Sequence, residues 1–349
     1  MPYFPRVRGW VRCLPRAEAG CLARPESMRI LSPIDGNDRV RDLVASPAHE
    51  FYCGLLPPEH VARFTPMYSL NRRSFVSCSF PDMETLRAAA AQVLAAGKKL
   101  FVAFNAPFYQ EREYRTVLDA ARVVEADGLS GLILSDPGLM AFLRASGITL
   151  PFAAGVDTGL LNGAGIRFLD AAVGLRRVIL DRCFSLREVT DIVASAPGLE
   201  YEVIVSNSYC KNVDGFCRHV HGLNAAGNVD DFANRMIPCW YPHTVEVMEA
   251  GDPERGESLA RFLEAASRVP YGGCAACALP ELQAAGVGFA KLAVRGFPTE
   301  RKLADIRFFA ECIELAARGL HPEEYRAEAR ALHERFLQAG CRATECYYG

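Results

Sequence analysis

Long apolar runs are missing from this chain. Its longest such stretches, VRDLVASPAH and RRVILD among them, fall far short of the roughly 20 residues that a helix needs to cross a bilayer. A secretory signal is missing as well, because no apolar segment follows the arginine-rich start. We therefore expect no membrane span and a reducing cytoplasm, where clustered cysteines are more often metal ligands than disulfide partners.

A strong net charge is also missing. Lysine and arginine number 39 against 41 aspartates and glutamates, which gives a formal net charge of -2 at pH 7. Such a chain has no global field that would draw it onto nucleic acid or an anionic membrane. RNA stays an open partner that the charge does not indicate, and we expect Arg176 and Arg177 on the solvated surface.

Two common catalytic signatures are absent. The sequence contains neither HExxH nor GxSxG, so no local motif supports a metallopeptidase or a serine hydrolase. The segment NGAG at 162–165 is too weak for a dinucleotide-binding fingerprint. A catalytic triad dispersed along the chain stays open, since triads are recognised by geometry rather than by sequence position.

What the sequence does contain is a repeated alternation of two patterns. After residue 28, short apolar or β-branched runs alternate with segments whose apolar residues recur every three or four positions. The runs predict strands at 28–32, 51–56, 75–79, 100–105, 131–136, 150–155, 178–182, 201–207 and 289–295. The other segments predict helices near 83–96, 111–126, 137–146, 162–173, 185–194, 299–318 and 321–339. About eight strand–helix units imply parallel strands and favour a TIM-like (β/α) barrel of the α/β class, with an open doubly wound sheet as the alternative.

The same pass along the chain predicts three regions. Residues 1–27 show neither helical nor strand periodicity, so we expect a disordered extension or a start codon chosen too far upstream. Residues 28–320 form the barrel, and the stretch 208–277 breaks its rhythm as a long cysteine-bearing insertion after a late strand. Residues 321–349 are expected to form a C-terminal helix and tail.

Polar residues close several of the predicted strands. In a barrel of this kind, chemistry gathers at the carboxyl ends of the strands. Asp136 and Asp181 stand before predicted helices and are interpreted as helix caps, which is the common role of aspartate there. Asn105 and Arg295 also close strands, and a catalytic role is the alternative for both.

Five cysteines lie in the insertion: Cys210, Cys217, Cys239, Cys274 and Cys277. Thiolates are soft ligands, and cysteines at irregular loop spacing suit an iron–sulfur cluster. A zinc site, the other candidate, typically shows two close pairs, and only Cys274 with Cys277 fits that pattern. Spacing alone does not decide which of these two is a ligand.

The cysteines nearer the C-terminus have simpler interpretations. Cys312 lies on the apolar side of the predicted helix 299–318, so we expect it to pack as a small hydrophobic residue. Cys341 and Cys346 would be able to bind metal, but fraying is the ordinary behaviour of a chain end.

Several segments together carry a family resemblance. VIVSNSYCKNVDGFC runs from a strand into a loop with two cysteines, and GGCAACALPELQAAGVGFAKLAVRG contains a Cys-x4-Leu-Pro-Glu-Leu pattern that begins at Cys274. YCG, GKKLFVAFN, GLILSDPGLM and RRVILDRCFSLREV add further short matches. Over roughly residues 28–319 the chain thus resembles the collagenase-like peptidase family, the thirty-second family of peptidases with unassigned mechanism. It departs from the family at Ala293, where relatives have glutamate, and in lacking a histidine after the fifth strand.

The resemblance implies a function. It implies a barrel with a [4Fe–4S] cluster held by Cys210, Cys217, Cys239 and Cys274, with Cys277 as an alternative ligand. It further implies oxygen-independent hydroxylation, with prephenate as the oxygen donor and an RNA base, a precursor in ubiquinone biosynthesis or another small aromatic as substrate.

Two other interpretations of the family resemblance stay open. The protein would be a peptidase if the family label were literal, or a non-catalytic iron–sulfur subunit paired with a homologous barrel. For the enzyme, Arg295 is the best candidate to grip a carboxylate of the donor, because guanidinium groups match carboxylates in bidentate fashion. Lys291 and Asn105 complete the predicted catalytic set.

Overall fold

The computed structural model describes residues 27–56, 70–71, 78–207, 213–216, 273–338, 340–341 and 346–348. Within these residues, eight parallel strands close into a barrel, each pairing with the next along the chain and the last with the first. The strands are β1 (Arg29–Pro33), β2 (Glu50–Gly54), β3 (Lys99–Phe104), β4 (Gly131–Leu134), β5 (Phe152–Ala154), β6 (Leu175–Ile179), β7 (Glu200–Ser206) and β8 (Phe289–Leu292). The predicted closed (β/α) barrel is confirmed, and the open sheet is excluded.

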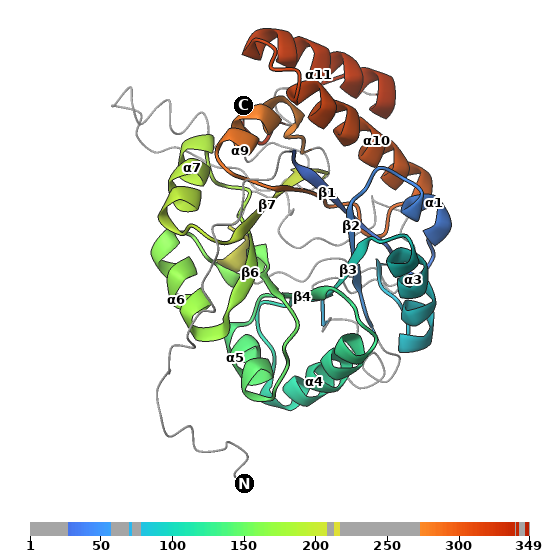
Figure 1. Cartoon of the computed structure of the whole chain (residues 1–349), viewed down its shortest axis with the longest axis vertical. Helices are drawn as coiled ribbons and strands as arrows, with labels where there is room; N and C mark the ends of the chain where they lie inside the picture. The colour runs from blue at the N-terminus through green and yellow to red at the C-terminus, as the bar shows by residue number, and fades with distance from the viewer. Residues whose placement is uncertain are drawn as a thin grey trace, which may run out of the picture.

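A helix follows each strand, and the helices surround the barrel (Figure 1). They are α1 (Val40–Val44), α3 (Met83–Ala95), α4 (Glu111–Ala126), α5 (Pro137–Ala145), α6 (Gly163–Val173), α7 (Leu186–Ser195), α9 (Leu279–Ala284) and α10 (Thr299–Ala316). The last helix, α11 (Pro322–Leu337), packs on the outside of α10. None of the helices in the described part of the chain is both long and apolar enough to span a bilayer.

Local sequence explains where these elements begin and end. The strands are short apolar runs such as KLFVAF and GLIL, buried on both faces as parallel strands between helices must be. A capping box opens α7, in which Ser185 and Glu188 each bind the other's backbone N–H. Gly174 ends α6 in the left-handed region at φ 65°, which glycine adopts without steric cost.

Two expectations about the elements were wrong. The run at 75–79 is no barrel strand: residues 75–77 lie outside the described part, and Phe80 makes only an isolated bridge to Leu55. Two short helices were also not predicted: α1, and α9, which begins with Leu279 and Pro280 and occupies the helix position between β7 and β8. The insertion therefore lies between β7 and the helix that belongs to its unit.

Two apolar layers result from this arrangement. The larger one fills the space between the strands and the helices. The smaller one lies inside the barrel and includes Leu31, Tyr52, Phe101, Ile133 and Ile179. The inner layer fills only part of the barrel lumen. Charged side chains also lie in the lumen, toward its N-terminal and C-terminal ends.

Candidate functional site

Arg177 lies inside the barrel near its N-terminal end. Its guanidinium nitrogens lie 2.9 Å from Glu50, 2.9 Å from Glu200 and 3.0 Å from Glu202. The guanidinium carbon also lies 3.4 Å from the centroid of the Phe289 ring, within the range of a cation–π contact. The prediction of a solvated Arg177 was therefore wrong, whereas its neighbour Arg176 is about half exposed as expected.

A cavity opens toward the C-terminal end of the barrel. It encloses about 310 Å³ of empty space, open solvent at its entrance included. Tyr52 and the isoleucines of the inner layer line its walls, together with Lys291, Asn105 and Arg295. The structure thus brings the three predicted catalytic residues to one cavity at the end of the barrel where (β/α) barrels carry their active sites.

Lys291 carries the only lysine side chain that lines this cavity among the described residues. Its Nζ donates to Glu202 Oε1 at 2.8 Å and lies 4.0 Å from the centroid of the Tyr52 ring. Burial lowers the pKa of Lys291, and the attraction of Glu202 opposes this shift without cancelling it. The site therefore favours the neutral amine more than water does.

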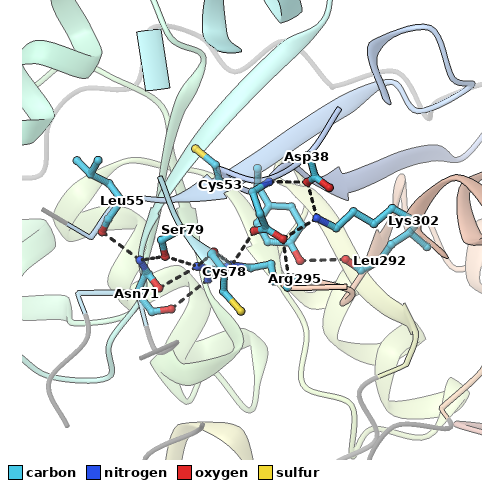
Figure 2. Close-up of polar contacts among 12 residues, drawn as sticks. Asp38, Cys53, Leu55, Asn71, Cys78, Ser79, Leu292, Arg295 and Lys302 are labelled. Carbon is cyan, nitrogen blue, oxygen red and sulfur yellow. Dashed lines mark hydrogen bonds and ion pairs between the residues drawn. The ribbon is translucent and has the colours of Figure 1, made fainter. Parts of the chain in front are cut away.

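Arg295 lies at the cavity rim, but most of its N–H groups are committed to the protein. They donate to the carbonyl oxygen and side chain of Asn71, to the carbonyl oxygen of Cys78 and to Ser79 Oγ, at 2.7 to 3.2 Å (Figure 2). The guanidinium thus joins the end of β8 to the segment after β2. Binding of a carboxylate by Arg295 stays a prediction. Because most of its N–H groups already donate to the protein, Arg295 would attract a carboxylate mainly through its positive charge.

A buried charge cluster beside the rim was not predicted. Lys302 Nζ donates to Asp35 Oδ2 at 2.6 Å and to Asp38, and Asp35 also accepts from the Gly296 backbone at 2.5 Å (Figure 2). Lys302 is fully buried, and the two carboxylates raise its pKa against the opposing effect of burial. The available signal was that Asp35 and Asp38 follow the first strand, in the same position as the polar residues that close other strands.

The cysteine insertion leaves and re-enters the barrel at one point. Ser206 pairs antiparallel with Cys274, and the Asn207 backbone donates to the Gly273 carbonyl oxygen at 2.7 Å. Asn207 has φ 60°, which asparagine adopts more readily than most residues. Its side chain donates to Asp305 at 2.5 Å and accepts from Arg301 at 2.9 Å. Helix α10 therefore fixes the junction from outside.

A second short piece of the insertion lies against the barrel. Asp214 accepts two hydrogen bonds from Arg182 Nη2, at 2.5 and 2.7 Å, and its backbone donates to Asp181 at 3.0 Å. A Cβ atom on Gly215 would overlap the backbone of Gly159, so these two segments of the chain touch at their glycines. The prediction that Asp181 caps the next helix was wrong: Ser185 is the N-cap of α7, and Asp181 instead accepts from the Asp214 backbone.

Of the predicted cluster ligands, Cys274 alone falls in the described part of the chain; Cys210, Cys217 and Cys239 lie outside it. The alternative ligand Cys277 is described as well. The Ala276 backbone donates to the Cys274 sulfur at 3.5 Å, a contact that cluster-bound thiolates commonly accept. Burial and the neighbouring Cys277 thiol raise the pKa of Cys274, so a thiolate there needs a compensating cation.

The chain end is ordered beside these thiols. Cys346 pairs with Cys274 in an isolated parallel bridge, and Tyr347 is buried against Gly273. The expectation of a fraying tail was wrong for these residues. In the described part of the chain, however, no three Cys, His, Asp or Glu side chains converge well enough to hold a metal ion. A cluster site would need ligands from the undescribed part of the insertion.

Comparison with known proteins gives the family. Two curated proteins are similar to this chain, both named tRNA hydroxylation protein P. The one from Escherichia coli strain K12 is 30% identical over 196 residues, which cover 56% of this chain and 39% of that protein. The one from Haemophilus influenzae is 27% identical over 188 residues, 54% of this chain and 37% of that protein. The match thus spans about two fifths of the length of these relatives.

A solved structure and a family profile complete the comparison. The structure of the U32 peptidase Mk0906 matches with 13% identity and a TM-score of 0.41, covering 54% of this chain and 73% of that one. The profile of peptidase family U32 matches residues 37–348. Because that match covers most of the sequence, this protein belongs to peptidase family U32.

Proposed function

We propose that this protein is an iron–sulfur hydroxylase that modifies an RNA base without molecular oxygen, and that tRNA in the cytoplasm is its substrate. The observation that carries this proposal is the 30% identity over 196 residues to a protein named for tRNA hydroxylation. A quinone precursor or another small aromatic would suit the same chemistry. The test must therefore identify the hydroxylated molecule.

The proposed cluster ligands are Cys210, Cys217, Cys239 and Cys274, with Cys277 as the alternative to Cys274. Chain connectivity supports this set. In the sequence, Cys210 follows the junction residue Asn207 by three positions. Cys217 directly follows Phe216, the last residue of the piece held by Arg182. A [4Fe–4S] cluster bound there would supply electron transfer or Lewis-acid activation of an oxygen donor.

Residues of the barrel would position this site. Arg182 and Asp181 hold the segment between Cys210 and Cys217, while Asn207 and α10 fix the strand end that precedes Cys210. The Ala276 N–H that points at the Cys274 sulfur would stabilise its thiolate. These contacts hold the described residues that lie next to Cys210 and Cys217 in the sequence, and this supports a single shared site.

The cavity beside this site would take the co-substrate. A prephenate-type donor carries carboxylates, and the buried charge of Arg295 at the rim favours an anion there. Asn105 offers an amide to orient it. The RNA base would approach from the open side, and a homologous barrel subunit would be able to complete the surface that holds it.

Nucleoside analysis tests the proposal. Total tRNA from wild-type and deletion cells is digested and compared by mass spectrometry. We expect one hydroxylated nucleoside to disappear on deletion and to return with the wild-type gene but not with Cys274→Ser. Unchanged nucleosides together with a lost small aromatic would move the proposal to a quinone precursor.

Two further results would favour the other readings of the family. Cleavage of casein by iron-free protein would support a peptidase. Restoration of the nucleoside only when a second family member is co-expressed would support the subunit of a heterodimer. Either result would overturn an enzyme that acts alone.

A further inference from the structure

Among the described residues, two buried lysines lie at the mouth end of this barrel, and their surroundings differ. Lys302 is paired with two carboxylates and is fully buried. Lys291 has one carboxylate partner in the described part of the chain, Glu202, and its side chain is 10% exposed where it lines the cavity. Of the two lysines, only Lys291 has a lowered pKa and also lines a cavity that a small molecule can enter.

The pKa values of the two amines are shifted in opposite directions by their surroundings. Asp35 and Asp38 stabilise the ammonium form of Lys302. Around Lys291, burial is the main effect that lowers the pKa, and the positive charges of Arg177 and Arg295 add to it. A lysine amine becomes a nucleophile when it is desolvated or placed near other cations, which is the setting of Lys291.

One residue that lines the cavity and one behind its wall have a polar atom without a hydrogen-bond partner among the described residues. Asn105 Oδ1 and Ser135 Oγ are buried and make no hydrogen bond within the described residues. Ser135 lies behind the cavity wall: it is fully buried, and its Oγ would lie 2.5 Å from a Cβ atom on the cavity-lining Gly155. Buried polar atoms of this kind cost free energy unless a bound molecule satisfies them. Asn105 lines the cavity together with Lys291, and its Oδ1 is an acceptor, so it indicates a ligand with a hydrogen-bond donor such as a hydroxyl.

We propose that Lys291 binds a small 2-oxo acid covalently in this cavity, as an imine. The neutral amine would attack the carbonyl carbon and form a C–N bond, and Glu202, 2.8 Å from Nζ, would relay the protons between nitrogen and the departing oxygen. Water leaves, and no oxidant or reductant is needed. The carboxylate of the ligand would gain from the positive charge of Arg295, while Ile133 and Ile179 would contact its apolar part.

Borohydride trapping tests this proposal independently of iron and of RNA. Full-length protein is incubated with pyruvate or with glyoxylate, reduced with sodium borohydride, digested and mapped by mass spectrometry. We expect one reduced adduct at Lys291 and none at Lys302, which is the matched buried lysine. Lys291→Arg keeps the cation and should lose the adduct, provided that circular dichroism shows a folded protein.

A second readout uses the unaltered chain. Slow reductive methylation with formaldehyde should label Lys291 in the free protein, and excess pyruvate should protect it without protecting the surface lysines. Absence of a Lys291 adduct with both oxo acids, or adducts spread evenly over exposed lysines, would overturn the proposal. A hydroxylase without the adduct, or the adduct without hydroxylase activity, would separate this proposal from the proposed function.

Discussion

The two ends of the barrel lumen are built on different principles. At the N-terminal end, Arg177 is enclosed by three carboxylates at 2.9 to 3.0 Å and stacks on Phe289. At the C-terminal mouth, Lys291 has one carboxylate partner among the described residues, and Asn105 Oδ1 has no hydrogen-bond partner among them. Ion pairs fill the N-terminal end, whereas at the mouth an unsatisfied amide oxygen lines a cavity that a ligand can reach.

The largest effect is expected from removing the charge of Arg177 at the N-terminal end of the lumen. Arg177→Met would leave Glu50, Glu200 and Glu202 buried with too little compensating charge. Removal of one partner from a buried ion pair costs about 3–5 kcal/mol in the free energy of unfolding. Denaturant unfolding measures this loss. Arg176→Gln, on the exposed neighbour, should cost less than about 1 kcal/mol, and equal losses in the two variants would refute the distinction.

A smaller loss should follow at the mouth when the glycine contact is filled. Gly215→Ala would force apart the backbones of Gly215 and Gly159, at a cost of about 1–3 kcal/mol. In Gly165→Ala, the matched control in α6, the new methyl group would meet only ordinary contacts at 3.6 and 3.8 Å, so its unfolding free energy should not fall. If Gly215→Ala is as stable as this control, the segment before Cys217 is not firmly docked.

The Asn207 junction should make stability depend on pH. Burial raises the pKa of Asp305 from 3.8 to about 6, against the opposing effects of Arg301 and Asn207. Between these two values the folded state holds a proton that the unfolded state has released, so the contribution of this group is lost as pH rises from about 4 to about 6.

The slope that one such group contributes is at most about 1.4 kcal/mol per pH unit. Unfolding free energies of wild type and Asp305→Asn, measured across this range, isolate it, because the other titrating groups are common to both proteins. We expect wild type to lose stability relative to Asp305→Asn as pH rises. A constant difference across the range would contradict the raised pKa.

The smallest effect is expected from removing the buried hydroxyl of Ser135, which lies behind the cavity-lining Gly155. Ser135→Ala removes a buried hydroxyl that has no partner among the described residues, so it should leave stability unchanged or raise it by up to about 1 kcal/mol. Ser185→Ala, which removes the cap of α7, should instead lower it by about 1 kcal/mol. Thermal unfolding compares them, and a clear loss in Ser135→Ala would mean that the hydroxyl is already bonded.

Most of the barrel could be predicted from the sequence, because buried parallel strands are continuous apolar runs and their helices carry three- and four-residue spacing. Asp136 was correctly predicted to cap its helix and accepts from Gly138 and Leu139. Asp181, in an equivalent position, instead binds a residue far along the chain. The local sequence pattern predicts that a polar residue closes the strand, but it does not predict which distant residue that side chain binds.

The charged lumen could not be predicted in the same way. Arg176 and Arg177 are adjacent in a strand, so they point to opposite faces, and only the closure of the barrel decides which face is buried. Likewise, the burial of Lys302 depends on Asp35 and Asp38, which are more than 260 residues away in the chain. The prediction of Lys291, Asn105 and Arg295 relied on family motifs and strand ends, and their shared cavity appears only in three dimensions.

Bound iron and acid-labile sulfide test most directly whether the barrel mouth holds a cluster. The protein is purified without oxygen, and both elements are quantified for wild type, Cys274→Ser and Cys312→Ala, the last removing a fully buried thiol from α10. We expect a brown wild-type protein with iron and sulfide, a loss of most of both in Cys274→Ser, and retention in Cys312→Ala. A folded wild-type protein without iron, or a folded Cys274→Ser protein with a full complement, would contradict the assignment of this end of the barrel as an iron–sulfur site.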